Sequence, residues 1–173
     1  MEIKKTEDGK EIVWGRYSYG EVINDGAVSF VGSFCSVARG VRACSYFGHR
    51  QDWVTTYPFK QVWNIPDAPD PIVPINERVI IGNDVWIGAY SVLLGGCMIN
   101  DGAIIGSFSV VHGEIPPYSV AVGNPCKVIR KRFSDETISK LLEIQWWNWS
   151  EEKIKKYIPL LSSDRMDEFI NGI

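Results

Sequence analysis

"IIGNDVWIGAYSVLLGGCMINDGAIIGSFSVV", residues 80–111, places an aliphatic side chain at every sixth position. A six-residue period fits neither the 3.6-residue repeat of an α-helix nor the two-residue alternation of an ordinary strand. It is typical of a parallel β-helix, in which three short strands of one hexapeptide each make one triangular coil. We therefore expect six side chains to point inward and to stack between coils: Ile81, Ile87, Leu93, Ile99, Ile105 and Val111.

The other positions of the hexapeptide agree with this interpretation. The fifth residue is small or β-branched and would fit a tight inner corner, while glycine or asparagine at the second and third positions tolerates turn dihedrals. The alternative is a sandwich of alternating strands, but a period of two does not leave Asn83, Asp84, Asn100 and Asp101 between the apolar positions. The sequence thus predicts an all-β solenoid.

The hexapeptide pattern also occurs earlier and is then interrupted. Val31, Val37 and Ala43 are six residues apart, so we expect coils over about 20–45 and 79–123. Residues 46–78 contain no hexapeptide and five of the nine prolines. An excursion of this length inside a regular fold is usually functional or disordered. Because it is rich in aromatic residues, including Tyr46 and Phe47, we expect an ordered loop folded against the coil wall.

The C-terminal part of the chain changes to a helical pattern. Ser134 and Ser150 stand where they could cap two amphipathic helices, and Ser163 could cap a third. We therefore divide the chain into a solenoid over 1–133 and a helical segment over 134–173. The motif "WWNW", residues 146–149, is expected to cover the open end of the coil, because a solenoid must hide its last core layer. The alternative is that these tryptophans stack on a ligand.

Composition excludes several classes of partner. The net charge of −3 gives no reason to expect nucleic acid, and no apolar run approaches the ~20 residues of a membrane span. The N-terminal residues lack the pattern of a signal peptide. The four cysteines contain no CxxC pair and are interpreted as reduced thiols rather than a disulfide frame or a metal site. These features predict a cytoplasmic protein without a bound metal.

Four motifs together resemble a known family. The hexapeptide stretch, "IPPYSVAVGNPCKVIRKRF", "LLEIQWWNW" and "GHRQDWVTTYPF" are similar to hexapeptide-repeat acyltransferases. The last motif narrows the resemblance to the xenobiotic acetyltransferase group, which includes chloramphenicol and streptogramin acetyltransferases and related sugar O-acetyltransferases. The resemblance implies a homotrimer of left-handed β-helices that binds a small-molecule acceptor. It also implies acetyl-CoA as co-substrate in a groove between subunits, with no tightly bound cofactor.

Histidine is the residue type that this chemistry needs, because an alcohol attacks a thioester poorly while it keeps its proton. The chain has two histidines, His49 and His112. By resemblance His49 is the general base. Asp52 could orient its imidazole or bind the acceptor, and the alternative is that Asp52 forms an ion pair with Arg50. A Cys44–His49 acyl-enzyme is a further alternative, although no third orienting group is evident.

The resemblance also implies positions for CoA. Trp86 faces the groove in relatives, Ala89 and Ser107 correspond to backbone contacts with the pantetheine arm, and Lys127 and Arg130 correspond to phosphate contacts. His112 and Gly113 replace the Thr-Lys pair of relatives. This removes an expected cation at 113 and makes His112 a possible neighbour of CoA, the alternative being an exposed turn residue.

Several chemical classes of acceptor are compatible with the sequence. Bulky Trp53, with Tyr57 nearby, suits stacking on a sugar ring and would narrow a pocket for a large macrocycle. We therefore expect O-acetylation of a sugar or a surface-polysaccharide precursor. Acetylation of an antibiotic of the chloramphenicol or streptogramin type is the alternative, followed by N-acetylation of an amino sugar and by a non-catalytic scaffold. The length of the acyl group stays open.

Overall fold

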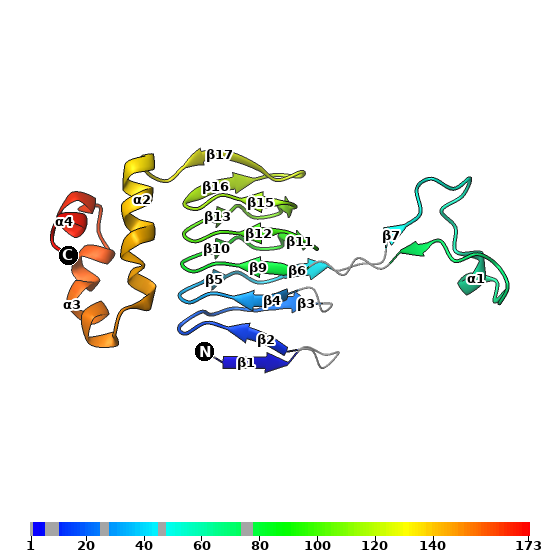
Figure 1. Ribbon diagram of the computed structural model, residues 1–173, viewed down its shortest axis with the longest axis horizontal. Coiled ribbons are helices and arrows are strands. Elements are labelled where there is room, and N and C mark those ends of the chain that lie inside the picture. Colours follow the sequence, from blue (N-terminus) through cyan, green and yellow to red (C-terminus); the bar gives the residue numbers. More distant parts are fainter. Residues whose placement is uncertain (1, 6–10, 25–27, 45–47, 74–77) are drawn as a thin grey trace.

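Most of the described strands wind into a solenoid with three faces, and each face is a sheet built mainly of parallel strands (Figure 1). The computed structural model describes residues 2–5, 11–24, 28–44, 48–73 and 78–173. The first sheet contains β1 (Glu2–Lys5), β2 (Glu11–Trp14), β4 (Val28–Val31), β9 (Val79–Ile81), β12 (Met98–Ile99) and β15 (Glu114–Ile115). The second contains β5 (Ser36–Val37), β10 (Trp86–Ile87), β13 (Ile104–Ile105), β16 (Ser119–Val122) and β17 (Lys127–Lys131). The third contains β3 (Val22–Asn24), β6 (Val41–Cys44), β11 (Val92–Leu94) and β14 (Val110–Val111).

Strand register confirms the six-residue period. Ile81 pairs with Ile99, and Leu93 pairs with Val111, so equivalent residues eighteen positions apart stack on one another. The six predicted side chains are at most 1% exposed. Strands that are one coil apart pair in parallel, and this pairing contradicts the sandwich alternative. The core is therefore a column of aliphatic layers enclosed by the three sheets.

Parallel strand pairing begins earlier in the chain than the predicted first coil over about 20–45. β2 pairs in parallel with β4, and β1 pairs antiparallel with β2. Ile12 and Trp14 are buried there, but an indole in place of a small aliphatic residue hides the hexapeptide spacing. At the other end β17 runs antiparallel to β16 and covers the last complete coil.

Three corners connect the sheets, and we number them in chain order. The first corner, between the first and second sheets, has left-handed backbone at Phe34, Asp84 and Tyr118, with φ of 61°, 53° and 49°. Coils approach closely beside it, because a Cβ added to Gly32 would lie 2.3 Å from the Gly82 carbonyl oxygen. The second corner joins the second and third sheets, and the third corner returns to the first sheet.

The C-terminal segment forms the predicted helices. They are α2 (Asp135–Ile144), a 3-10 turn η1 (Trp146–Asn148), α3 (Glu151–Leu161) and α4 (Met166–Asn171). Ser134 Oγ accepts a hydrogen bond from the Thr137 N–H, and Ser150 Oγ accepts one from the Lys153 N–H, as N-caps do. The prediction for Ser163 is wrong, since α4 has Arg165 at its N-cap position and no side-chain cap.

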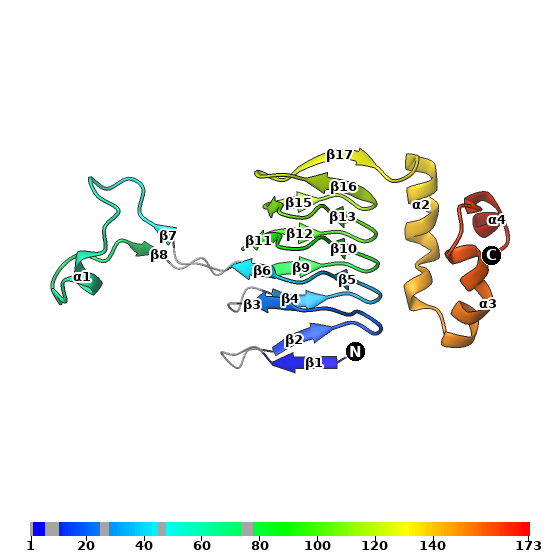
Figure 2. The ribbon, with the colours of Figure 1, turned by 180° about the vertical axis from the view of Figure 1, so that it is seen from behind.

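The helices pack along the first corner and not over the end of the coil (Figures 1 and 2). Trp146 packs on Phe34 in a tilted arrangement with ring centroids 4.7 Å apart, and Arg16 Nη2 donates to the Trp147 carbonyl at 2.8 Å. The expectation that "WWNW" covers the open end is therefore wrong. The physical reason is that the first corner presents aromatic side chains, such as Phe34 and Tyr118, that the helices bury.

Residues 48–73, which we call the arm, leave the solenoid at the third corner. The arm consists of β7 (Gly48–His49), α1 (Phe59–Val62) and β8 (Ile72–Val73). It extends away from the coil on the side opposite the C-terminal helices (Figures 1 and 2). The predicted packing against the coil wall is thus wrong for the described residues. Tyr46, Phe47 and residues 74–77 lie outside them.

Within the arm, aromatic side chains pack on one another. Tyr57 contacts Phe59 and Phe59 contacts Trp63, with ring centroids 4.8 and 4.9 Å apart. These rings remain partly exposed, and among the described residues no second layer covers them. The helices of the described part of the chain include none that is long and apolar enough to cross a membrane.

Candidate active site

His49 is held in one orientation at the base of the arm. β7 and β8 pair antiparallel, with His49 opposite Ile72, and the Arg50 N–H donates to the Pro71 carbonyl at 2.8 Å. His49 Nδ1 lies 2.5 Å from the Thr56 carbonyl oxygen. A carbonyl can only accept, so Nδ1 carries the proton. In the neutral ring Nε2 then carries no proton and can accept one, which is the arrangement that a general base needs.

Asp52 lies on Arg50 rather than on His49. Arg50 Nε donates to Asp52 Oδ1 at 2.8 Å, and Nη2 donates to Oδ2. The Arg50 guanidinium holds the pKa of the Asp52 carboxyl below its usual value. This geometry matches the alternative in which Asp52 fastens the arm, and the orienting contact to the imidazole comes from Thr56. Sequence reasoning missed Thr56 because a backbone carbonyl has no sequence signal.

A second carboxylate, which was not predicted from the sequence, lies near the base of the arm. Asp70 accepts hydrogen bonds from the Ile72 N–H at 2.9 Å and from Gln61 Nε2 at 2.8 Å. These contacts hold the pKa of Asp70 below its usual value, and the charge of His49 acts in the same direction. The arm therefore keeps an ionised carboxylate within electrostatic range of the imidazole.

The candidate acceptor residues share the arm with His49. Trp53 is 38% exposed, and the Arg50 guanidinium lies 5.6 Å from the centre of its ring. Tyr57 is also exposed and packs on Phe59. The arm thus offers aromatic surface close in sequence to the candidate base, and the predicted contact of Trp53 and Tyr57 with an acceptor stays a prediction.

Trp86 and Arg130 belong to one row on the outer face of the second sheet. The register places Trp86 beside Ile104, Ile104 beside Val120 and Val120 beside Arg130. At ~4.8 Å between strands, Trp86 and Arg130 are about 14 Å apart. Both are exposed, and Lys127 lies on the same strand as Arg130. We call Trp86, Ile104, Val120 and Arg130 the axial row.

Ala89 and Ser107 lie on the second corner, at the edge of the axial row. They stand one coil apart, and the Phe108 N–H donates to the Ala89 carbonyl at 2.9 Å. Tyr90 and Phe108 stack beside them with centroids 5.3 Å apart and form an exposed aromatic pair that sequence reasoning missed. At this corner the backbones of neighbouring coils pack closely, while the rings of Tyr90 and Phe108 are accessible.

His112 and Gly113 lie elsewhere, on the third corner from which the arm also leaves. Both are exposed, and Gly113 has a left-handed φ of 65°. They are therefore on a different corner from Ala89 and Ser107. Their predicted contact with CoA stays a prediction.

The cysteines lack the character of nucleophiles. All four are buried thiols that form no disulfide. Burial raises the pKa of Cys35 to about 11 and that of Cys97 to about 12. Cys44 is only 6% exposed, so its position disfavours the acyl-enzyme alternative.

Comparison with known proteins identifies the class that this fold and site define. A family model described as "Bacterial transferase hexapeptide (six repeats)" matches residues 78–113. The chain is 43% identical over 140 residues to a chloramphenicol acetyltransferase from Klebsiella aerogenes, covering 79% of this chain and 67% of that protein. It is 37% identical over 179 residues to a virginiamycin A acetyltransferase from Staphylococcus aureus, covering 92% and 80% of the two chains. The chain belongs to the hexapeptide-repeat acetyltransferase family.

Two further points define the extent of this likeness. The chain spans about two thirds of the length of the chloramphenicol acetyltransferases that it matches. A solved structure of the N-acyltransferase AntD from Bacillus cereus, in complex with dTDP-4-amino-4,6-dideoxyglucose and coenzyme A, has a TM-score of 0.53 and 18% identity. It covers 78% of this chain and 71% of that one, and it supports the solenoid fold alone.

Proposed function

We propose that this protein transfers the acetyl group of acetyl-CoA to a hydroxyl of an antibiotic of the chloramphenicol or streptogramin type. The observation that carries the proposal is the His49 imidazole, whose Nδ1 contacts the Thr56 carbonyl, so that Nε2 is the unprotonated ring nitrogen. The relatives named for chloramphenicol and virginiamycin favour a drug acceptor over the sugar that the sequence reading preferred. That reading assumed that Trp53 narrows a walled pocket, but the arm carries Trp53 away from the coil of its own chain.

The chemistry needs few groups. The acceptor hydroxyl donates its hydrogen bond to His49 Nε2 and loses its proton as its oxygen attacks the thioester carbonyl carbon. The carbon–sulfur bond then breaks, and the imidazolium returns the proton to the leaving thiolate of CoA. Backbone N–H groups are suited to hold the developing oxyanion. Acetyl-CoA is a co-substrate in this scheme, and no tightly bound cofactor takes part.

A homotrimer of left-handed coils is part of the proposal. One chain does not bring His49 and the axial row together, because the arm points away from its own coil. The first sheet also carries an outward apolar row in which Phe30 lies beside Ile80 and Ile80 beside Met98. Ile80 and Met98 are 36% and 40% exposed, as expected of a surface that another subunit covers. Sedimentation equilibrium should give three times the 19.5 kDa mass of one chain.

The acceptor is tested by measuring the release of CoA thiol from acetyl-CoA. The acceptors are chloramphenicol, a group A streptogramin, free sugars and nucleotide sugars. The proposal expects turnover with a drug at a kcat/KM at least tenfold above that of any sugar. A preference for sugars would favour the second candidate, O-acetylation of a sugar, which the exposed aromatic rings of the arm support. Absence of turnover with every acceptor would refute the drug proposal.

Lys127 and Arg130 are predicted to bind the phosphates of CoA. Changing both to Ala should raise the KM for acetyl-CoA roughly 10–100-fold, since a charge-assisted hydrogen bond contributes about 1.5–3 kcal/mol. The kcat should change by less than about twofold, because this contact is similar in ground and transition states. Steady-state kinetics with varied acetyl-CoA measures both constants.

A matched control removes two positive charges elsewhere. Changing Lys155 and Lys156 on α3 to Ala alters the net charge equally, on the side of the coil opposite the arm. This variant should keep the KM of the parent. An equal rise of KM in both double variants would mean that general electrostatic attraction, and not phosphate contact, sets the affinity.

Buried cysteines that form no disulfide are typical of reducing compartments. A cytoplasmic location is therefore included in the proposal.

A further inference from the structure

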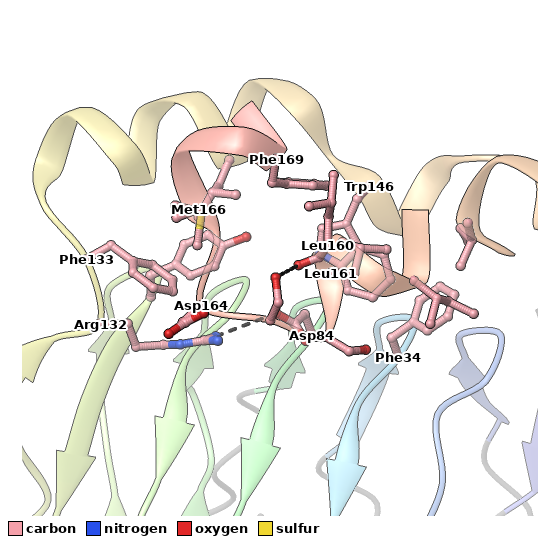
Figure 3. Close-up of a pocket in the computed structure, with 16 residues that line it drawn as sticks. Phe34, Asp84, Arg132, Phe133, Trp146, Leu160, Leu161, Asp164, Met166 and Phe169 are labelled. Atoms are coloured by element: carbon pink, nitrogen blue, oxygen red, sulfur yellow. Dashed lines mark hydrogen bonds and ion pairs between the residues drawn. The ribbon is translucent and has the colours of Figure 1, made fainter. Parts of the chain in front are cut away.

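We propose that the C-terminal helices and the first corner enclose a second binding site, for a hydrophobic molecule that carries one protonated amine. The site is a pocket of about 660 Å³ between the coil and α2, α3 and α4 (Figure 3). This volume lies within the range of roughly 300–1,000 Å³ that is usual for small-molecule sites. The inference concerns a site separate from that of acetyl transfer.

The walls of the pocket are mostly apolar. Phe34 comes from the first corner, Trp146 from η1, Leu161 from α3 and Phe169 from α4 (Figure 3). These four elements therefore leave an open space between them where they meet. An apolar body, preferably aromatic, would fill this space and bury the surrounding rings.

Tyr118 provides the first polar contact. Its side chain is 2% exposed and lines the pocket, and its hydroxyl is the buried side-chain group without a hydrogen-bond partner among the described residues. The ring is held in place, because Arg132 lies 5.3 Å from its centre and a Cβ on Gly102 would come within 2.5 Å of it. A buried hydroxyl without a partner costs about 1–3 kcal/mol. A hydrogen-bonding atom of a ligand would remove that cost.

Asp84 provides the charge. Its Oδ2 lies 3.5 Å from Arg132 Nη1, while the same nitrogen donates to the Gly102 carbonyl at 2.6 Å. The ion pair is longer than a charge-assisted hydrogen bond of about 2.7–2.9 Å, so the carboxylate is only partly compensated. Burial raises the pKa of Asp84, and the nearby Asp101 acts in the same direction. Asp164 also lines the pocket, so two carboxylates and one guanidinium line it, and a cationic ligand is favoured over an anionic one.

The location separates this pocket from the candidate active site. The arm with His49 leaves the third corner, whereas the pocket lies at the first corner, on the opposite side of the coil (Figures 1 and 2). The axial row lies on the outer face of the second sheet and contributes none of the lining residues. Occupation of the pocket should therefore not compete with acetyl-CoA.

The test uses three probes that share a naphthalene ring and differ in charge. They are the cation of naphthylethylamine, the neutral alcohol naphthylethanol and the carboxylate anion of naphthaleneacetic acid. Isothermal titration calorimetry on the whole protein measures each affinity. We expect the amine to bind at least fivefold more tightly than the alcohol, and the anion to bind most weakly. Saturating acetyl-CoA should leave the affinity for the amine unchanged.

Two substitutions distinguish a ligand site from a packing defect. Tyr118→Phe should weaken binding of the amine and of the alcohol at least fivefold, and yet leave the Tm of the free protein unchanged or higher, because it removes a hydroxyl that lacks a partner. Asp84→Asn should abolish the preference for the amine over the alcohol. Asparagine tolerates the left-handed backbone at this position. The matched control is Tyr19→Phe, at a residue that is 66% exposed and outside the pocket, which should alter neither affinity nor Tm.

Four results would each overturn the proposal. They are the absence of binding by all three probes, equal affinity for the three, competition between the amine and acetyl-CoA, and a lower Tm in Tyr118→Phe. The last result would mean that the hydroxyl already has a partner in the free protein.

Discussion

Replacing His49 with Ala is expected to lower kcat by about 10²–10⁴, the usual contribution of a positioned general base. The imidazole is exposed on the arm and packs in no core layer, so its removal leaves no cavity. Its fixed contact is to the Thr56 carbonyl, which can form a hydrogen bond to water in the variant. The expected loss is therefore a loss of proton transfer, with the fold, the assembly and the affinity for CoA preserved. Steady-state kinetics, sedimentation and titration with CoA measure these four properties.

The comparison variant is His112→Ala. It removes the second imidazole of the chain, also from an exposed turn, and should reduce kcat far less. If His49→Ala retains most of its activity while His112→Ala is inactive, then the base has been assigned to the wrong histidine. If His49→Ala also loses CoA binding, the histidine has a structural role that the arm geometry does not indicate.

Truncation of one core layer should produce the second large effect. Leu93 is fully buried and pairs with Ala43 and Val111 on the neighbouring coils. Leu93→Ala should lower the free energy of unfolding by about 2–5 kcal/mol, because the missing atoms leave a cavity between stacked layers. Unfolding in guanidinium chloride, monitored by circular dichroism, measures the change.

The next residue provides the control. Leu94 follows on the same strand but points outward and is 37% exposed. Leu94→Ala should cost less than about 1 kcal/mol, since only part of that side chain leaves water on folding. Equal losses for the two variants would contradict the inward and outward alternation on which the hexapeptide interpretation depends.

The fold could be predicted well where one local rule governs it. Each inward position of the coil must be aliphatic because the same layer repeats, so the period is visible in the sequence without any knowledge of long-range contacts. The predicted caps Ser134 and Ser150 are likewise local, since each contacts an N–H three residues away. The N-terminal coil escaped prediction because Trp14 fills its layer with a residue that breaks the pattern.

The site was less predictable, for a different reason. The residue types of the arm suggested His49, but its orientation depends on the Thr56 carbonyl, and every residue has a carbonyl. The direction of the arm and the docking of the helices are set by which surfaces remain unpaired after the coils stack. Two features that set these surfaces are the close approach of the coils at Gly32 and Gly82 and the aromatic side chains of the first corner. Neither feature is encoded by a single stretch of sequence.

The third corner allows the arm to be inserted without any change to the ladder of strands. The chain leaves after β6 and returns at β9, which then pairs with β4 on one side and β12 on the other as if nothing had intervened. The coil therefore tolerates arms of different length and composition, because no inward layer depends on them. We propose that exchange of the arm changes the range of acceptors, while the solenoid that supports it keeps its stability. A chimaera that carries the arm of a relative should fold like the parent and acetylate what the relative acetylates.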